Sequence, residues 1–223
     1  MSTDQSTPLA SVKPAPVVAQ PSATGLAWGN SAPLALAGFA ATTFMLSMVN
    51  ANLVPVAITP VVFGVALVFG GLAQFIAGVI QLRVGNVFGG VLFCGFGAFW
   101  MSLYVVAEVF LKAIPLLQIG HALGLFLYAF GIFSAIMFVA SFRTSVCVVL
   151  ALALLTSALF VLGAGNYLPS TGAIRTGGWL GIALAGVAFY LCLAEVCEAT
   201  YGREIFPVGH LAKPERESLG EQP

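Results

Sequence analysis

Charged side chains are scarce in this sequence. Lysine, arginine, aspartate and glutamate make up 7% of the 223 residues, whereas apolar residues make up 60%, and a soluble domain is normally about 25% charged. The mean hydropathy is +1.03, and a water-soluble fold of this length could not bury so much apolar area. The sequence therefore excludes an ordinary soluble domain and predicts a protein whose main solvent is lipid.

Residue patterns that carry chemistry are also missing. The eight basic and eight acidic residues cancel, so no basic field exists that would attract nucleic acid. The cysteines, which lie in apolar runs without a CxxC spacing, are Cys94, Cys147, Cys192 and Cys197. The apolar runs hold no nucleophile–base pair, metal cluster or phosphate-binding loop. We therefore expect no metal, no cofactor, no nucleic-acid partner and no enzymatic activity.

The first 29 residues differ from the rest of the chain. They are rich in proline, serine, threonine and alanine, and they contain neither the basic start nor the apolar stretch of a signal peptide. Such a composition is typical of disordered segments. We predict a disordered cytoplasmic tail over 1–29, a transmembrane domain over 30–202 and a cytoplasmic C-terminal tail over 203–223.

Six apolar stretches are long enough to cross a bilayer, which takes about 20 helical residues. They lie at 33–54, 59–80, 87–107, 117–140, 146–163 and 178–195. The predicted fold class is an all-α integral membrane protein, a bundle of six transmembrane helices. The longest break is expected at 165–177, which contains Pro169, Arg175 and several glycines. Small residues spaced four apart, such as Gly177 and Gly181, favour close helix packing.

The distribution of basic residues predicts the orientation. If the N-terminus is cytoplasmic, six basic residues fall on the cytoplasmic side, at Lys13, Arg83, Arg143, Arg203, Lys213 and Arg216. Only Lys112 and Arg175 then fall outside. Cytoplasmic loops carry an excess of basic residues, and an even number of spans places both ends on one side. We therefore expect both termini in the cytoplasm.

Several motifs resemble those of the acetate/succinate transporter family, also called Gpr1/Fun34/YaaH. The segment NSAPLALAGF at 30–39 is similar to the Asn-Pro-Ala-Pro-Leu-Gly-Leu motif of that family. Further similar segments, in the same order as in the family, are GGLAQFIAG at 70–78, GNVFG at 85–89, GAFW at 97–100, YGR at 201–203 and PVG at 207–209. The chain departs from the family pattern at Ser31, Ala35, Gln81 and Phe96.

The resemblance implies a transporter in the plasma membrane. The expected substrates are acetate and similar small monocarboxylates, with succinate as a further candidate, and the expected assembly is a homohexamer with one pathway in each protomer. Family members have an apolar constriction, and the matching positions here are Phe39, Phe96 and Leu155. Such a ring excludes hydrated ions, because stripping their water is costly. Whether transport is channel-like or proton-coupled stays open, and so does a non-transporting sensor or scaffold with this fold.

The polar residues of the spans are nearly all uncharged. This disfavours a pump with buried carboxylates or a cation channel with an acidic ring. The candidate substrate contacts are Asn30, Thr42, Thr43, Ser47, Asn50, Gln74 and Thr156. Thr43, Ser47 and Asn50 share one helical face, which could hydrogen-bond a small carboxylate. These side chains could instead bond their own backbone or join neighbouring helices.

Overall fold

The structure is a computed structural model that describes residues 28–211. The structure confirms the predicted all-α fold with six helical spans. Residues 28–211 contain no strand. The spans are α1 (Ala32–Asn50); η1 (Val56–Ile58) with α2 (Thr59–Val65), η2 (Ala66–Ala73) and α3 (Gln74–Arg83); α4 (Val87–Val105) with η3 (Val106–Phe110) and η4 (Leu111–Ala113); η5 (Leu116–Gln118) with α5 (Ile119–Ala140) and η6 (Ser141–Arg143); α6 (Val146–Tyr167); and α7 (Thr171–Tyr201).

Polar side chains begin three of the helices. Asn86, Ser145 and Ser170 each precede a helix and accept a hydrogen bond from a backbone N–H of its first turn, in α4, α6 and α7 respectively. This satisfies donors that have no partner within the helix. Helix α7 ends at Tyr201 and is followed by Gly202, whose φ of 69° is the left-handed conformation that glycine adopts without strain.

The expectation of a long loop at 165–177 is wrong. Helix α6 continues to Tyr167 and α7 begins at Thr171, which leaves only 168–170 between them. The cluster of glycines and proline suggested a loop, but Pro169 precedes the Ser170 cap and therefore lies outside the helix. The glycines that follow are tolerated in α7 because they let it approach its neighbours: Gly177 packs on Leu162 of α6 and Gly178 on Ala51.

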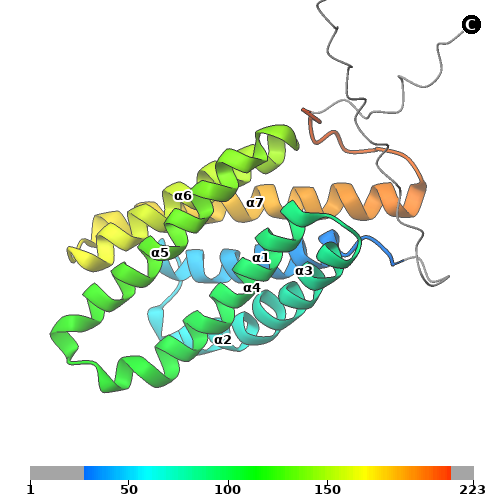
Figure 1. Ribbon diagram of the computed structural model, residues 1–223. Helices are drawn as coiled ribbons and strands as arrows, with labels where there is room; N and C mark the ends of the chain where they lie inside the picture. The colour runs from blue at the N-terminus through cyan, green and yellow to red at the C-terminus, as the bar shows by residue number, and fades with distance from the viewer. Residues whose placement is uncertain (1–27, 212–223) are drawn as a thin grey trace, which may run out of the picture.

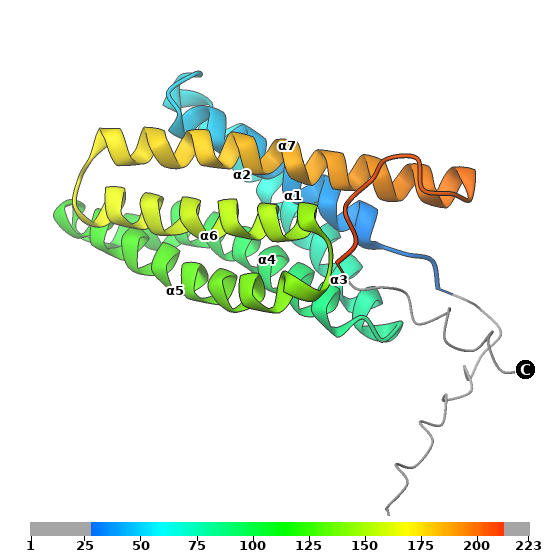
Figure 2. The same cartoon turned by 90° about the horizontal axis from the view of Figure 1, so that it is seen from above.

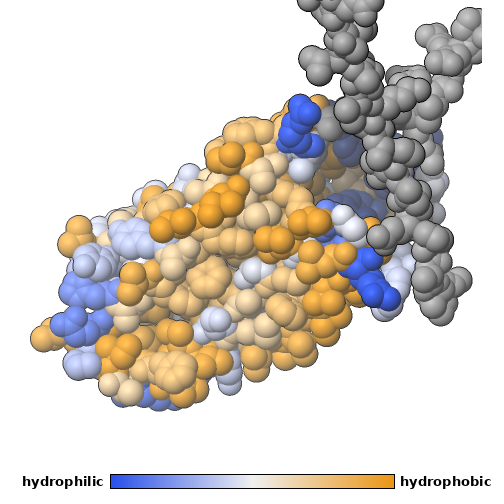
Figure 3. Space-filling view, viewed as in Figure 1, coloured by the Kyte–Doolittle hydropathy of each residue, from blue (hydrophilic) through white to orange (hydrophobic). Residues whose placement is uncertain are grey.

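The helices run roughly along one long axis (Figures 1 and 2). Helix α1 packs along α7, α7 along α6, α6 along α5, and α3 along α4. Both ends of the described chain lie at the same end of the bundle, at the right of Figure 2. On the face that Figure 3 shows, the surface between the two polar ends is broadly apolar, as expected for a protein surrounded by lipid.

The segment after α7 folds back across that end of the bundle (Figure 2). Backbone carbonyls of Val208 and Gly209 accept hydrogen bonds from Cys147 and Val146, in the first turn of α6, at 3.2 and 2.8 Å. His210 forms an isolated antiparallel bridge with Ser145. These residues belong to the predicted C-terminal tail. Of the predicted N-terminal tail, only positions 28 and 29 are among the described residues. Three of the basic residues that predict the orientation, Lys13, Lys213 and Arg216, also lie outside the described residues.

Candidate transport pathway

Two cavities lie inside the bundle, one on each side of its middle. The near cavity, on the side of the chain ends, has a volume of about 270 Å³ and lies among α1, α3, α4, α6 and α7. The far cavity, toward the opposite end, has a volume of about 370 Å³ and has additional walls from α2 and α5. Both are large enough for a two-carbon acid.

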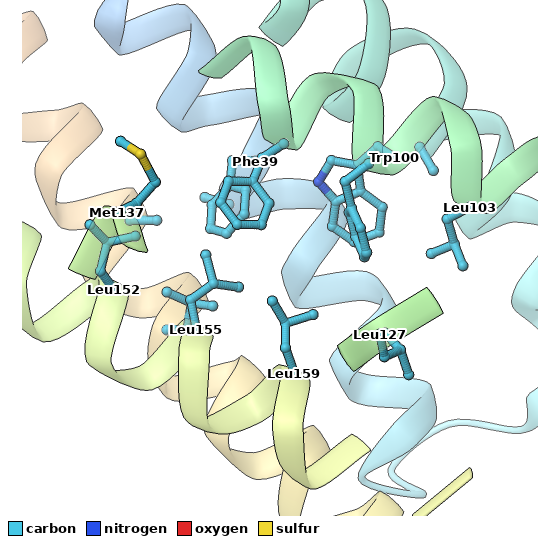
Figure 4. Close-up of a cluster of buried hydrophobic side chains, with 14 residues drawn as sticks. Phe39, Trp100, Leu103, Leu127, Met137, Leu152, Leu155 and Leu159 are labelled. Carbon is cyan, nitrogen blue, oxygen red and sulfur yellow. The ribbon is translucent and has the colours of Figure 1, made fainter. Parts of the chain in front are cut away.

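Four side chains line both cavities and therefore stand between them: Phe39 of α1, Phe96 of α4, Leu155 of α6 and Leu184 of α7. All four are buried, and Phe96 is only 1% exposed. The rings of Phe39 and Phe96 meet edge to face, with centroids 5.9 Å apart. Figure 4 shows Phe39 on one side of the gap and Leu155, on α6, on the other. We call these four residues the constriction.

A third hollow connects the near cavity with the surface. Its volume is about 450 Å³, and it shares Asn86, Thr144, Leu191 and Glu195, among others, with the near cavity. The segment after α7 forms one of its walls through Val208 and His210. This hollow, which we call the mouth, therefore links the near cavity to the end of the bundle where the chain ends lie.

Three buried polar atoms have no hydrogen-bond partner among the described residues: Thr43 Oγ1, Trp100 Nε1 and Gln74 Oε1. Thr43 and Trp100 line the far cavity, and Gln74 lines the near cavity. An unsatisfied buried polar group costs about 1–3 kcal/mol, so native proteins keep few of them. Their placement around the two cavities fits groups that bind water or a passing polar solute.

The other predicted polar residues divide into two groups. Ser47 and Asn50 line the far cavity, as Thr43 does. Thr42 does not, because its hydroxyl donates to Gly38 O at 2.8 Å and its side chain packs on Gly70. Thr156 lies within 2.8 Å of Ser134 and joins α6 to α5. The structure therefore brings neither Thr42 nor Thr156 to a cavity.

Asn30 lies in the mouth and not at the constriction. Its Oδ1 accepts from the N–H of Ala32 at 3.0 Å, and its Nδ2 donates to Glu195 at 2.9 Å. Asn30 therefore both caps α1 and joins it to α7. Glu195, which lines the mouth and the near cavity, is the last residue of the predicted span 178–195, and sequence reasoning missed Leu184 and Trp100 as lining residues. One leucine among many carries no signal of its position in a pathway, whereas the indole N–H of Trp100 was a detectable polar group within an apolar run.

Comparison with known proteins places this geometry in context. The model of the GPR1/FUN34/yaaH family matches residues 12–213. Ammonia transport outward protein 2 of Saccharomyces cerevisiae is 36% identical over 174 residues, which are 76% of this chain and 62% of that protein. Succinate-acetate/proton symporter SatP of Escherichia coli is 31% identical over 81% of this chain and 95% of its own length. Acetate permease A of Emericella nidulans is 31% identical over 82% of this chain and 66% of its own length.

A solved structure, described as that of the bacterial acetate channel SatP, superposes with a TM-score of 0.77 at 28% identity. The match covers 82% of this chain and all of that one. These comparisons confirm the predicted family and the six-helix membrane fold. The match spans less than two thirds of the yeast protein's length.

Proposed function

We propose, from the premise that the chain belongs to the GPR1/FUN34/yaaH family, that it carries acetate and similar small monocarboxylates across the plasma membrane. The route runs from the mouth through the near cavity, past the constriction and into the far cavity. The observation that carries this proposal is the separation of the two cavities by four apolar side chains from four different helices. Succinate, named for the bacterial symporter, is a further candidate substrate.

The constriction favours small, partly apolar solutes. A hydrated sodium or potassium ion would have to lose its water between Phe39, Phe96 and Leu155, and nothing charged is there to replace that water. Acetate offers a methyl group to the rings and one carboxyl group to the polar residues. In the far cavity the indole N–H of Trp100 and the hydroxyls of Thr43 and Ser47 are suitable partners for that carboxyl group.

The proposed assembly and orientation follow from the sequence. We infer a homohexamer with one pathway in each protomer, and both termini in the cytoplasm, so that the mouth opens to the cytoplasm. The family resemblance supports the hexamer, and the basic-residue bias supports the orientation. The position of both described chain ends at one end of the bundle agrees with this orientation.

Uptake of labelled acetate by proteoliposomes tests the proposal. Purified protein should give saturable acetate uptake with and without a pH gradient, and no sodium or potassium current. Ammonia is a useful third solute, because one relative is named for ammonia transport. Folded protein without any acetate uptake would overturn the proposal and would favour a sensor or scaffold.

A further inference from the structure

The near cavity and its mouth contain more negative than positive charge. Glu195 lines both. Glu198 and Glu204 line the mouth, where the positive groups are the Arg143 guanidinium and, when protonated, His210. His210 lies 3.9 Å from Glu204. No lysine or arginine among residues 28–211 lines the near cavity, so a carboxylate anion entering it would meet Glu195 without a compensating cation.

A hydrogen bond from Asn30 ends on Glu195. Asn30 Oδ1 accepts from the Ala32 N–H at 3.0 Å, so its Nδ2 is the atom that donates to Glu195 Oε2, at 2.9 Å. The Gln81 amide lies between Asn30 and Asn86, with contacts of 3.0 and 2.7 Å. The Asn30 N–H donor suits a carboxylate oxygen, which only accepts.

Groups of the protein itself accept from part of the free N–H groups at the helix N-termini around the mouth. Helices α1, α4 and α6 all begin there, and free N–H groups at a helix start attract anions. Asn30 accepts from α1 and Asn86 from α4. Ser145 and the carbonyls of Val208 and Gly209 accept from α6. An incoming carboxylate would therefore compete with these acceptors for the N–H groups that they bind.

We propose that Glu195 is a specificity-determining residue that acts as the resident anion of the near cavity, so that the pathway carries the un-ionised acid in preference to the carboxylate anion. This inference rests on the proposed function and assigns the charge state of its substrate. The un-ionised acid carries its own donor, which suits the Glu195 carboxylate and the unpartnered Gln74 oxygen, and it brings no charge to repel. Its proton travels with it, so transport moves no net charge.

The groups that face Glu195 come from several elements. Asn30 precedes α1, Asn86 caps α4, Arg143 and Thr144 follow α5, and Glu204 and His210 lie in the segment after α7. Glu198 lies on α7 itself and lines the mouth but not the near cavity. Glu198 is therefore a matched control: its removal changes the charge of the mouth by the same amount without altering the near cavity.

The test compares wild type, Glu195→Gln, Glu195→Asp and Glu198→Gln in proteoliposomes. Acetate uptake is measured at constant total acetate from about pH 5.5 to 7.5, with protein-free vesicles to subtract diffusion through lipid. A potassium gradient with valinomycin imposes a membrane potential. Glutamine keeps an oxygen that accepts from Asn30, so Glu195→Gln removes the charge and retains the hydrogen bond. Size-exclusion chromatography normalises uptake to folded protein.

Wild-type uptake should fall about tenfold per pH unit, following the un-ionised fraction, and should not respond to potential. Glu195→Gln should retain uptake at high pH and become sensitive to potential, whereas Glu195→Asp and Glu198→Gln should behave as wild type. Wild-type uptake driven by potential would overturn the inference even if no variant folds. So would a Glu195→Gln profile identical to wild type, or equal effects of Glu195→Gln and Glu198→Gln.

Absence of saturable uptake in wild type would instead be a failure of the proposed function. Acetate binding to the solubilised protein, measured by calorimetry, then decides the inference separately. The affinity of wild type should decrease about tenfold per pH unit in the same range, and that of Glu195→Gln should stay nearly constant. Identical pH dependence in the two proteins would overturn it.

Discussion

Phe39 and Phe96, which belong to the first and third spans, meet edge to face with their ring centroids 5.9 Å apart. The ring of Phe96 also packs against the rings of Phe99 and Phe133, with centroid separations of 6.1 and 5.4 Å. The pairs with Phe39 and Phe99 are edge to face and the pair with Phe133 is tilted. Edge-to-face pairs are each worth about 0.5–1.5 kcal/mol beyond burial, so Phe39 and Phe99 help to hold Phe96 in place. A fixed ring in the narrowest part of a pathway defines a size limit that mutations can change.

The adjacent residues Thr43 and Thr42 allow a hydroxyl that lines the cavity to be compared with one that only bonds its own helix. Thr43→Val removes a hydroxyl that has no described partner and lines the far cavity. If that hydroxyl bonds the substrate, the KM for acetate should rise roughly fivefold, the equivalent of about 1 kcal/mol. Folded yield should not change, because no described hydrogen bond is lost. Proteoliposome uptake as a function of acetate concentration measures this.

Thr42→Val is the control for that experiment. Its hydroxyl bonds the backbone of its own helix, at Gly38 O, and it does not line either cavity. We expect an unchanged KM. A KM increase of the same size in both variants would show that the effect comes from the helix and not from the cavity.

Two glycines of α7 test the close packing of the sixth span. A Cβ at Gly181 would clash with Ser47 of α1, whereas a Cβ at Gly186 would meet no atom within 4 Å. Gly181→Ala should lower the free energy of unfolding by about 1–3 kcal/mol through overpacking. Gly186→Ala should raise it by up to about 1 kcal/mol, because alanine favours the helix. Thermal unfolding of the two purified variants compares them, and equal melting temperatures would show that α1 and α7 do not approach closely here.

Cysteine labelling tests the orientation. In a cysteine-free background, a cysteine in place of Ser170, in the short α6–α7 connection, should react with a membrane-impermeant reagent added outside cells. A cysteine in place of Val84, which is exposed between α3 and α4, should react only after permeabilisation. The reverse pattern would place both described chain ends outside and would refute the assignment from basic residues.

Hydropathy was sufficient to predict the spans, because each crosses lipid as one apolar run. It could not show that the sixth span continues from Thr171 to Tyr201, since glycines and a proline near its start resemble a loop in sequence. The Ser170 cap was the available signal for the earlier start. The pairing of Val208 and Gly209 with α6 has no such signal, because it depends on backbone atoms brought together by the whole bundle.

The candidate site was only partly predictable for a related reason. Helical spacing placed Thr43, Ser47 and Asn50 on one face, and all three line the far cavity. Thr42 is the neighbour of Thr43 in sequence but packs on Gly70 of the second span. Only the packing of α1 in the bundle distinguishes Thr42 from Thr43. The positions Phe39, Phe96 and Leu155 came from family resemblance; their role in gating stays a prediction. Leu184 could not have been chosen, because its place depends on contacts among four helices.

The proposed pathway is tested most directly by two leucines of α6. Leu155 and Leu152 are both buried and one turn apart, but only Leu155 lines both cavities. Replacement of either by alanine should cost about 2–5 kcal/mol of stability, so acetate and succinate uptake are measured per folded protein after size-exclusion chromatography. We expect Leu155→Ala to increase uptake several-fold and to favour succinate relative to acetate, while Leu152→Ala keeps both rates. Equal rates and equal selectivity in the two variants would contradict a constriction at Leu155.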